Sequence, residues 1–352
     1  MNMSLRYSLW LVLLGLLSLY IIKATAKVPT IVVFGDSSVD SGNNDYIMTT
    51  AKANFRPYGR DFDNEEPTGR FSNGRLATDY LSKAFGLPSF VPAYLDPDYG
   101  IEQFASGVCF ASASTGLDNA TADIFNVIPM WQQLEYYKEY RGRLKSYQGE
   151  AKAKDTLSEA LYIVSIGTND FIENYYSPRS ERSSQFTVPE YEEFLLGIAE
   201  GFLRELHGLG GRKIDVTSLP PMGCLPLTRM TNSKAVGFCN EEYNALARDF
   251  NVKLRRLVRR LNGELPGAKI VYGNVYDFFA DVVQNPSSYG FQNSVTGCCG
   301  TGLFETSFLC NTRTFTCPDA DEFVFWDSIH PTDRMNHIIA DQIMKSTLYI
   351  FL

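Results

Sequence analysis

Two short segments near opposite ends of the chain carry residues that together could form a nucleophile and its base. Gly35-Asp36-Ser37 follows the apolar run 29–34, and Asp327-Ser-Ile-His330-Pro331 lies close to the carboxyl terminus. A serine hydroxyl is a weak nucleophile until an adjacent base takes its proton, and a third group must hold that base in place. The two segments supply one candidate for each part, which is the chemistry of acyl transfer.

His330 is the candidate base by elimination among the three histidines of the chain. Histidine suits this task because its pKa of about 6.5 lets it accept and return a proton near neutrality. The pattern predicts His207 in the last turn of a helix, where a cation suits the helix dipole. It places His337 on the surface of the last helix, whereas Pro331 biases His330 into a loop.

Asp327 is the candidate partner of the base, because a spacing of three residues lets its carboxylate reach Nδ1 of His330 within one turn. The competing carboxylate is Asp333. We expect it to begin the last helix with its side chain turned to the helix amides. Asp36, next to the serine, is expected to stabilise the turn rather than to react.

Two further segments could supply donors for the oxyanion that develops during acyl transfer. Gly167-Thr-Asn169-Asp170 follows a strand run and would present the Asn169 amide at the same sheet edge as Ser37. Gly107 would contribute a backbone N–H where no side chain blocks the substrate. Each fragment alone is ordinary turn chemistry, so the interpretation depends on their order along the chain.

The elements that must position these residues alternate between strands and helices. Apolar, β-branched runs predict strands at 31–34, 161–166, 214–219 and 270–272, with a fifth near 108–110. Helical patterns lie at 76–85, 191–206, from 243, and at 335–348. This alternation predicts right-handed βαβ units and a parallel sheet covered on both faces, within one domain. The stretches 177–185 and 285–301 read as surface loops.

Taken together, these segments resemble those of the GDSL (SGNH) esterase/lipases. Gly35-Asp36-Ser37, Gly107, Gly167-Thr-Asn169-Asp170 and Asp327-Ser-Ile-His330-Pro331 look like the four sequence blocks of that family. The segments 33–44, 221–226 and 297–300 resemble its secreted plant branch. Ser38 replaces the leucine that names the motif, and the second block reads Gly107-Val-Cys-Phe-Ala-Ser where similar proteins usually show Gly-Ala-Asn-Phe-Ala-Ser.

The resemblance implies a three-layer α/β/α sandwich with a flavodoxin-like parallel sheet of about five strands. It implies metal-independent hydrolysis of carboxylic esters, with Ser37 as nucleophile, His330 as base and Asp327 as the residue that orients it. The Ser37 N–H, Gly107 and Asn169 would form the oxyanion hole. No cofactor is expected, and the Asp36, Asp40, Asn43 and Asp45 spacing does not fit a calcium loop.

The amino-terminal segment and the cysteines indicate export. Residues 1–26 read as a cleaved signal peptide, with an apolar stretch at 8–22 and a small-residue cleavage site at 24–26; the alternative is an uncleaved anchor helix, for which the stretch is short. Residues 27–352 then form the mature domain. Seven cysteines in an exported chain suggest disulfides. Cys224 and Cys239 bracket one loop; Cys298, Cys299, Cys310 and Cys317 form a cluster of open connectivity; Cys109 reads as a buried thiol.

The net charge and one sequence motif bear on what the protein binds and on its modification. A net charge of −8 argues against nucleic acid, and the basic residues at 248–260 interleave with apolar ones as on an amphipathic helix. Asn119-Ala-Thr is a candidate glycosylation site in an exposed loop. The expected partner is a small-molecule or lipid ester, with no membrane span after signal removal.

Three functions fit this pattern. The first is a secreted serine esterase/lipase that forms an acyl-enzyme. The second is an acyltransferase, which would use the same residues and pass the acyl group to another alcohol. The third is an inactive exported binding protein that keeps the fold; the complete set of candidate residues counts against it.

Overall fold

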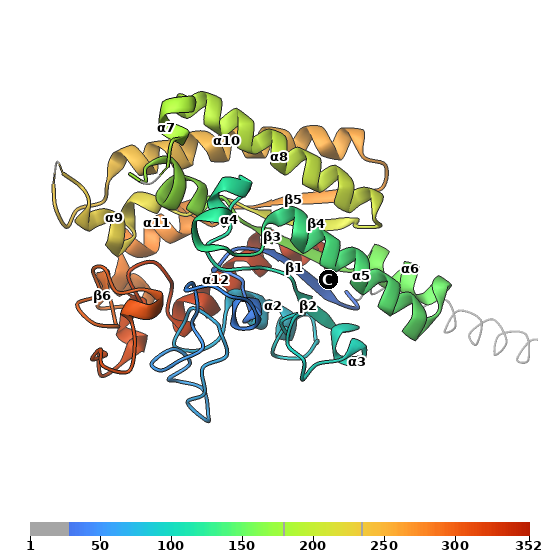
Figure 1. Ribbon diagram of the computed structural model, residues 1–352, viewed down its shortest axis with the longest axis horizontal. Coiled ribbons are helices and arrows are strands. Elements are labelled where there is room, and N and C mark those ends of the chain that lie inside the picture. Colours follow the sequence, from blue (N-terminus) through green and yellow to red (C-terminus); the bar gives the residue numbers. More distant parts are fainter. Residues whose placement is uncertain (1–27, 179, 234) are drawn as a thin grey trace, which may run out of the picture.

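A five-stranded parallel sheet forms the centre of the molecule, here seen in a computed structural model that describes residues 28–352 except 179 and 234. Figure 1 shows the strands lying side by side in the order β2-β1-β3-β4-β5. Their bounds are β1 Ile31–Gly35, β2 Gly107–Cys109, β3 Leu161–Ser165, β4 Lys213–Thr217 and β5 Lys269–Gly273. All five expected strands are present, with ends that differ by at most two residues from expectation.

Alternating side chains of each strand enter two separate apolar cores, because successive residues of a strand point to opposite faces. On β1, Val32 and Phe34 belong to one core, and Ile31 and Val33 to the other. Both faces are therefore buried, which explains why the strands read as continuous apolar runs.

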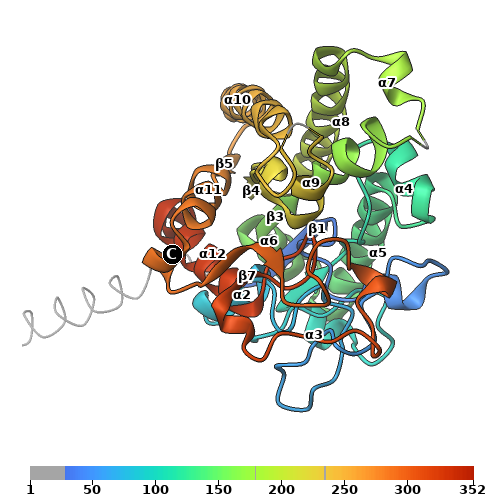
Figure 2. The same cartoon turned by 90° about the vertical axis from the view of Figure 1, so that its left-hand side faces the viewer.

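Two helical layers cover these cores (Figures 1 and 2). One layer consists of α5 (Met130–Gln148), α6 (Glu150–Glu159), α8 (Val188–Gly208) and α10 (Glu241–Glu264); the other consists of α2 (Ala77–Ala84), α11 (Tyr276–Gln284) and α12 (Asp333–Ser346). The shorter helices are α3 (Ile101–Phe104), α4 (Asn119–Phe125), α7 (Arg182–Gln185) and α9 (Pro226–Met230). The expected three-layer α/β/α sandwich is confirmed.

A second, two-stranded sheet lies in a region where the sequence suggested only a loop. β6 (Asn293–Gly297) pairs in parallel with β7 (Phe323–Phe325), which ends two residues before Asp327. The stretch 285–301 was expected to be a surface loop, and that expectation is wrong for residues 293–297. The small sheet holds the strand that leads into Asp327.

The expected signal peptide, residues 1–26, lies outside the described residues. Among the residues that are described, no helix has both the length and the apolar character needed to cross a bilayer.

Candidate active site

Ser37 lies just beyond the carboxyl end of β1, in a turn that requires glycine at position 35. Gly35 has φ 146°, and a Cβ there would lie 2.0 Å from the carbonyl oxygen of Ser165. The Gln133 side chain bonds both backbone groups of Gly35, accepting from its N–H at 3.0 Å and donating to its carbonyl at 2.9 Å. The turn is thus fixed from the neighbouring strand and from α5.

The structure brings Ser37, His330 and Asp327 together. Oγ of Ser37 lies 2.9 Å from Nε2 of His330, and Nδ1 of His330 lies 2.9 and 2.8 Å from the two carboxyl oxygens of Asp327. Asp327 is fully buried, His330 is 5% exposed and Ser37 is partly buried. A proton on Nδ1 facing the carboxylate leaves Nε2 free to accept the serine proton.

Asp327 is held as an anion by four hydrogen-bond donors besides the ring of His330. Its Oδ1 accepts the N–H groups of Ile329 at 2.8 Å and His330 at 2.7 Å. Its Oδ2 accepts hydroxyl bonds from Tyr58 at 2.8 Å and Thr306 at 3.1 Å. Burial alone would raise the pKa of Asp327, but the charge of His330 and the hydrogen bonds from His330 and Ile329 outweigh it, and the pKa is lowered.

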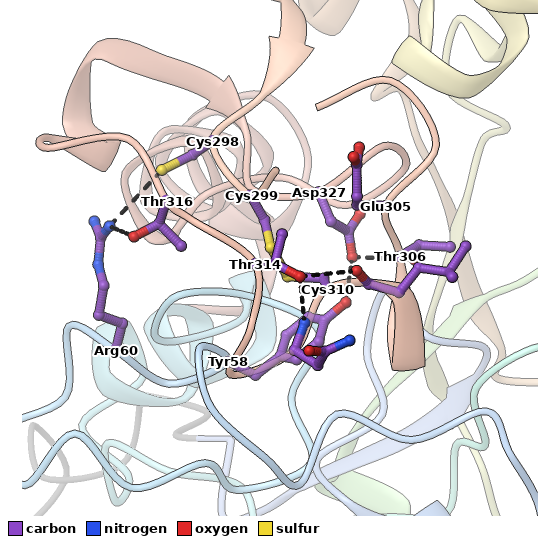
Figure 3. The surroundings of a disulfide bond; sticks show 12 residues. Tyr58, Arg60, Cys298, Cys299, Glu305, Thr306, Cys310, Thr314, Thr316 and Asp327 are labelled. Carbon is purple, nitrogen blue, oxygen red and sulfur yellow. Dashed lines mark hydrogen bonds between the residues drawn. A yellow bond between two sulfur atoms is a disulfide. The ribbon is translucent and has the colours of Figure 1, made fainter. Parts of the chain in front are cut away.

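A disulfide-linked segment closes the site behind Asp327 (Figure 3). The cluster pairs as Cys299–Cys310 and Cys298–Cys317, and Thr306 lies within both loops. The N–H of Ser307 also donates to the Tyr58 hydroxyl at 2.8 Å. These links position two of the donors to Asp327. The remaining pair is Cys224–Cys239, as its spacing suggested, and Cys109 is a buried free thiol, as expected.

Asp333 does not act as expected. The hydroxyl of Thr332 caps α12 by accepting the Met335 N–H. The carboxylate of Asp333 instead accepts the Arg75 N–H at 2.5 Å and the Tyr80 hydroxyl at 2.7 Å. It joins α12 to α2 and does not contact His330, so Asp327 has no rival carboxylate on this helix.

Asn169 follows β3 at the same edge of the sheet and lines the cavity that contains Ser37 and His330. Its Nδ2 donates one hydrogen to the Thr115 carbonyl at 3.0 Å, which leaves its second amide hydrogen for another acceptor. The next residue, Asp170, begins the helical turn η2 (Asp170–Tyr175) and accepts the N–H groups of Leu117 and Asp118 at 2.8 and 3.0 Å. These bonds hold the Asn169 loop against the segment that follows β2.

Gly107 lies at the wrong end of its strand to meet Ser37. It pairs in register with Ile31, the first residue of β1, whereas Ser37 follows Gly35 at the other end. Four residues of strand separate these levels, about 13 Å at about 3.3 Å per residue. The expectation that the Gly107 N–H faces the substrate is therefore wrong, because the glycine opens the strand rather than ending it.

The segment after β2, missed by the sequence reasoning, is the part of this block that reaches the site. Ser112 donates its N–H to the Gly35 carbonyl at 3.0 Å, and Thr115 accepts the Asn169 bond. Between them, Ser114 adopts φ 63°, rare for a residue with a side chain. Within the described residues the N–H groups of Ser37 and Ser114 have no protein acceptor. The run of small residues at 111–116 was the available signal.

Asp36 stabilises the turn, as expected. Its Oδ1 accepts both the N–H of Ser38 at 2.9 Å and the Ser38 hydroxyl at 2.7 Å. Burial raises the pKa of Asp36 despite these bonds and despite the nearby His330. The carboxylate therefore shapes the loop that presents Ser37.

A largely apolar cavity opens beside Ser37 and His330. It extends between the sheet and the layer of α2, α11 and α12, and its apolar walls include Val39, Leu81, Ile163, Leu219, Phe279 and Ile339. Such a cavity suits a ligand with an apolar chain.

A serine bonded to a histidine, itself bonded to a buried aspartate at the carboxyl edge of an α/β sheet, is the arrangement of serine hydrolases. Sequence comparison identifies the family within this class. The model of the GDSL-like Lipase/Acylhydrolase family matches residues 31–343. The chain belongs to this family.

Curated relatives agree with this assignment. GDSL esterase/lipase At2g04570 of Arabidopsis thaliana is 54% identical over 327 residues, covering 93% of each chain. GDSL esterase/lipase At2g42990 of the same plant is 55% identical, covering 93% of this chain and 94% of its own length. GDSL esterase/lipase At4g26790 is 51% identical over 98% of this chain and 99% of its own length. The expected class, a carboxylic ester hydrolase, is confirmed.

The candidate glycosylation site, Asn119, is exposed, but it begins α4 rather than lying in a loop. Thr121 of the same tripeptide is fully buried and donates its hydroxyl to Asp170 at 2.7 Å. The hydroxyl that completes the sequon therefore has a structural role.

Proposed function

We propose that the chain hydrolyses carboxylic esters through an acyl-enzyme formed on Ser37. The observation that carries this proposal is the 2.9 Å contact between Oγ of Ser37 and Nε2 of His330, with Asp327 on the other ring nitrogen. His330 takes the serine proton as Oγ attacks the ester carbon, and returns it to the alcohol as the C–O bond breaks. Water, activated by His330 in the same way, then releases the acid and frees Ser37.

The proposed oxyanion hole consists of the Ser37 N–H, the second amide hydrogen of Asn169 and an N–H from the 112–115 segment in place of Gly107. Ser114 supports the last assignment, because it lies between the residues bonded to Gly35 and to Asn169. Donors fixed before the reaction stabilise the developing charge without reorganising.

Replacing Asn169 by alanine is expected to lower kcat by about 10²–10³-fold with little change in KM, because the donor acts mainly on the transition state. Steady-state kinetics on p-nitrophenyl acetate measure both values. Asn169→Asp keeps the shape and removes the donor, so it should lose a similar factor. Near-normal turnover by the aspartate variant would remove Asn169 from the oxyanion hole.

The apolar cavity supports an ester with an apolar acyl chain, that is, a small-molecule or lipid ester. Transfer of the acyl group to a second alcohol would use the same residues. Product analysis in the presence of a competing alcohol separates the two activities: we expect free acid as the main product. A predominance of the transferred ester would make the chain an acyltransferase, and no turnover of any ester would favour an exported binding protein.

We further propose that residues 1–26 are a signal peptide removed on export and that residues 27–352 form one secreted domain. The amino-terminal sequence pattern and the three disulfides fit an oxidising compartment. Asn119 is the proposed glycan acceptor. The intact mass of the exported protein, before and after enzymatic deglycosylation, tests both; a mass that includes residues 1–26 would contradict cleavage.

A further inference from the structure

A carboxyl group lies inside the apolar layer on the active-site side of the sheet. On β4, Ile214 and Val216 enter the core beneath α5, α8 and α10, so Asp215 between them points to the opposite face. Its neighbour in register on β3, Ile163, belongs to the core beneath α2, α11 and α12, the helices on that side in Figure 2. Asp215 is 1% exposed.

Asp215 is incompletely bonded for a buried carboxyl. Its Oδ2 accepts the Thr217 hydroxyl at 3.2 Å, and its Oδ1 has no partner among the described residues. On the side of β5 no side chain covers this oxygen, because the adjacent residue is Gly273. A Cβ at Gly273 would lie only 2.7 Å from Oδ1 of Asp215. Burial raises the pKa of Asp215 to about 7, against only the Thr217 hydrogen bond. A buried polar group without a hydrogen bond lowers the stability of the fold, so we expect Oδ1 of Asp215 to bond a ligand.

Two more unbonded polar atoms line the same cavity as Asp215. They are the hydroxyl of Thr78 on α2 and Nδ2 of Asn336 on α12, and the two residues are 2% and 3% exposed. The three residues come from three different elements around one cavity whose other walls are mainly apolar. Ser37 and His330 line that cavity too. Unbonded donors and acceptors thus lie where an acyl chain would lie.

The register of the strands places this polar group away from the ester carbonyl. Asp215 is level with Ile163 and Val33, two residues short of Gly35, and β4 is two strands from β1. The offset is about 7 Å along the strands and about 10 Å across them, at about 3.3 Å per residue and about 4.8 Å per strand. A group bound by Asp215 is therefore several bonds from the carbon attacked by Ser37.

We propose that Asp215, together with Thr78 and Asn336, binds a hydroxyl group on the acyl chain and makes the enzyme selective for esters of hydroxylated fatty acids. A hydroxyl can donate to Oδ1 of Asp215 and accept from Nδ2 of Asn336, whereas an ammonium group could not accept the amide hydrogen. The inference rests on the proposed function, since it assumes that the acyl chain of a Ser37 ester fills this cavity.

Competition between p-nitrophenyl esters whose acyl chains span about 12 Å, the offset of Asp215 from Gly35, with and without a terminal hydroxyl, tests the proposal. Wild type should prefer the hydroxylated ester roughly tenfold to a hundredfold in kcat/KM, because the plain chain leaves the polar atoms unbonded. Asp215→Leu should reverse the preference, largely through KM, and Asp215→Asn should retain part of it. Asp249→Leu, an exposed change on α10 in the opposite layer, should keep the wild-type ratio.

Wild-type turnover of p-nitrophenyl acetate is the separate test of the proposed function, because acetate is too short to reach Asp215. Acetate turnover without preference for the hydroxylated chain would overturn the Asp215 proposal alone and leave only water in the cavity. Preference for an amine-bearing chain would also overturn it. No turnover of either ester would instead defeat the proposed function.

A pH series on stability checks the buried state of the carboxyl independently of catalysis. The pKa of Asp215 is about 7 in the folded protein against an ordinary 3.8, so between these values the folded state binds more protons and stability falls as pH rises. Asp215→Asn removes this contribution, so the Tm of wild type should fall relative to the variant from about pH 4 to about pH 7. A constant Tm difference would contradict the unpaired carboxyl on which the proposal rests.

Discussion

Replacing Ser37 by alanine is expected to lower the turnover of p-nitrophenyl acetate by about 10⁴-fold or more, because the acyl-enzyme cannot form without the hydroxyl. The remaining rate would come from the oxyanion donors and from binding alone. Among the residues that the structure describes, the hydroxyl makes one hydrogen bond, to His330, so its removal should leave the fold intact. Steady-state kinetics, with a thermal unfolding curve for each protein, measure both effects.

Ser38→Ala is the matched control for this substitution. Ser38 is adjacent to Ser37 and also lines the cavity, but its hydroxyl donates to Asp36 and lies 2.9 Å from the Ser165 hydroxyl rather than near His330. We expect the variant to retain activity within about tenfold, since it loses two hydrogen bonds of the turn, to Asp36 and to Ser165, each of about 1 kcal/mol, and neither involves His330. Equal losses in the two variants would defeat the choice of nucleophile.

Asp327→Asn is expected to lower kcat by about 10⁴-fold with little change in KM. The asparagine amide would present hydrogens where Asp327 now accepts those of His330, Tyr58 and Thr306. It would favour the wrong tautomer of His330 and remove the negative charge that stabilises the imidazolium. The lowered pKa of Asp327 means that wild type keeps this charge well into acidic solution.

Tyr58→Phe is the graded control, because it removes one of several donors and leaves the carboxylate in place. We expect a loss of about tenfold or less, corresponding to one hydrogen bond to a charged group. A loss as large as that of Asp327→Asn would assign the effect to disruption of the disulfide-linked segment. Retention of full activity by Asp327→Asn would remove the residue from the mechanism.

The strands and the triad could be predicted from the sequence because each is marked locally. The run at 31–34 is apolar and β-branched, and Ser37 follows it at the edge where parallel sheets place reactive groups. Among three histidines, His330 alone stood in a loop with a carboxylate three residues upstream. These signals lie within a few residues of one another, so they needed no knowledge of tertiary contacts.

Features set by register or by distant partners could not be predicted in this way. The prediction for Gly107 was wrong because a sequence block shows that a strand is present, but not which of its residues lies level with Ser37. The prediction for Asp333 was wrong because the partners of its carboxylate, Arg75 and Tyr80, are far away in sequence. Asp215 attracted no notice, because a single acidic residue in a strand run is ordinary until the cavity beside it is known.

Active-site labelling tests the central claim most directly. The protein is treated with a fluorophosphonate, an organophosphate probe that reacts only with an activated serine, and the modified peptide is identified by mass spectrometry. The adduct is expected on Ser37 in wild type, with labelling lost in Ser37→Ala, kept in Ser38→Ala and strongly slowed in His330→Gln. An adduct on another serine, or undiminished labelling without His330, would contradict the account.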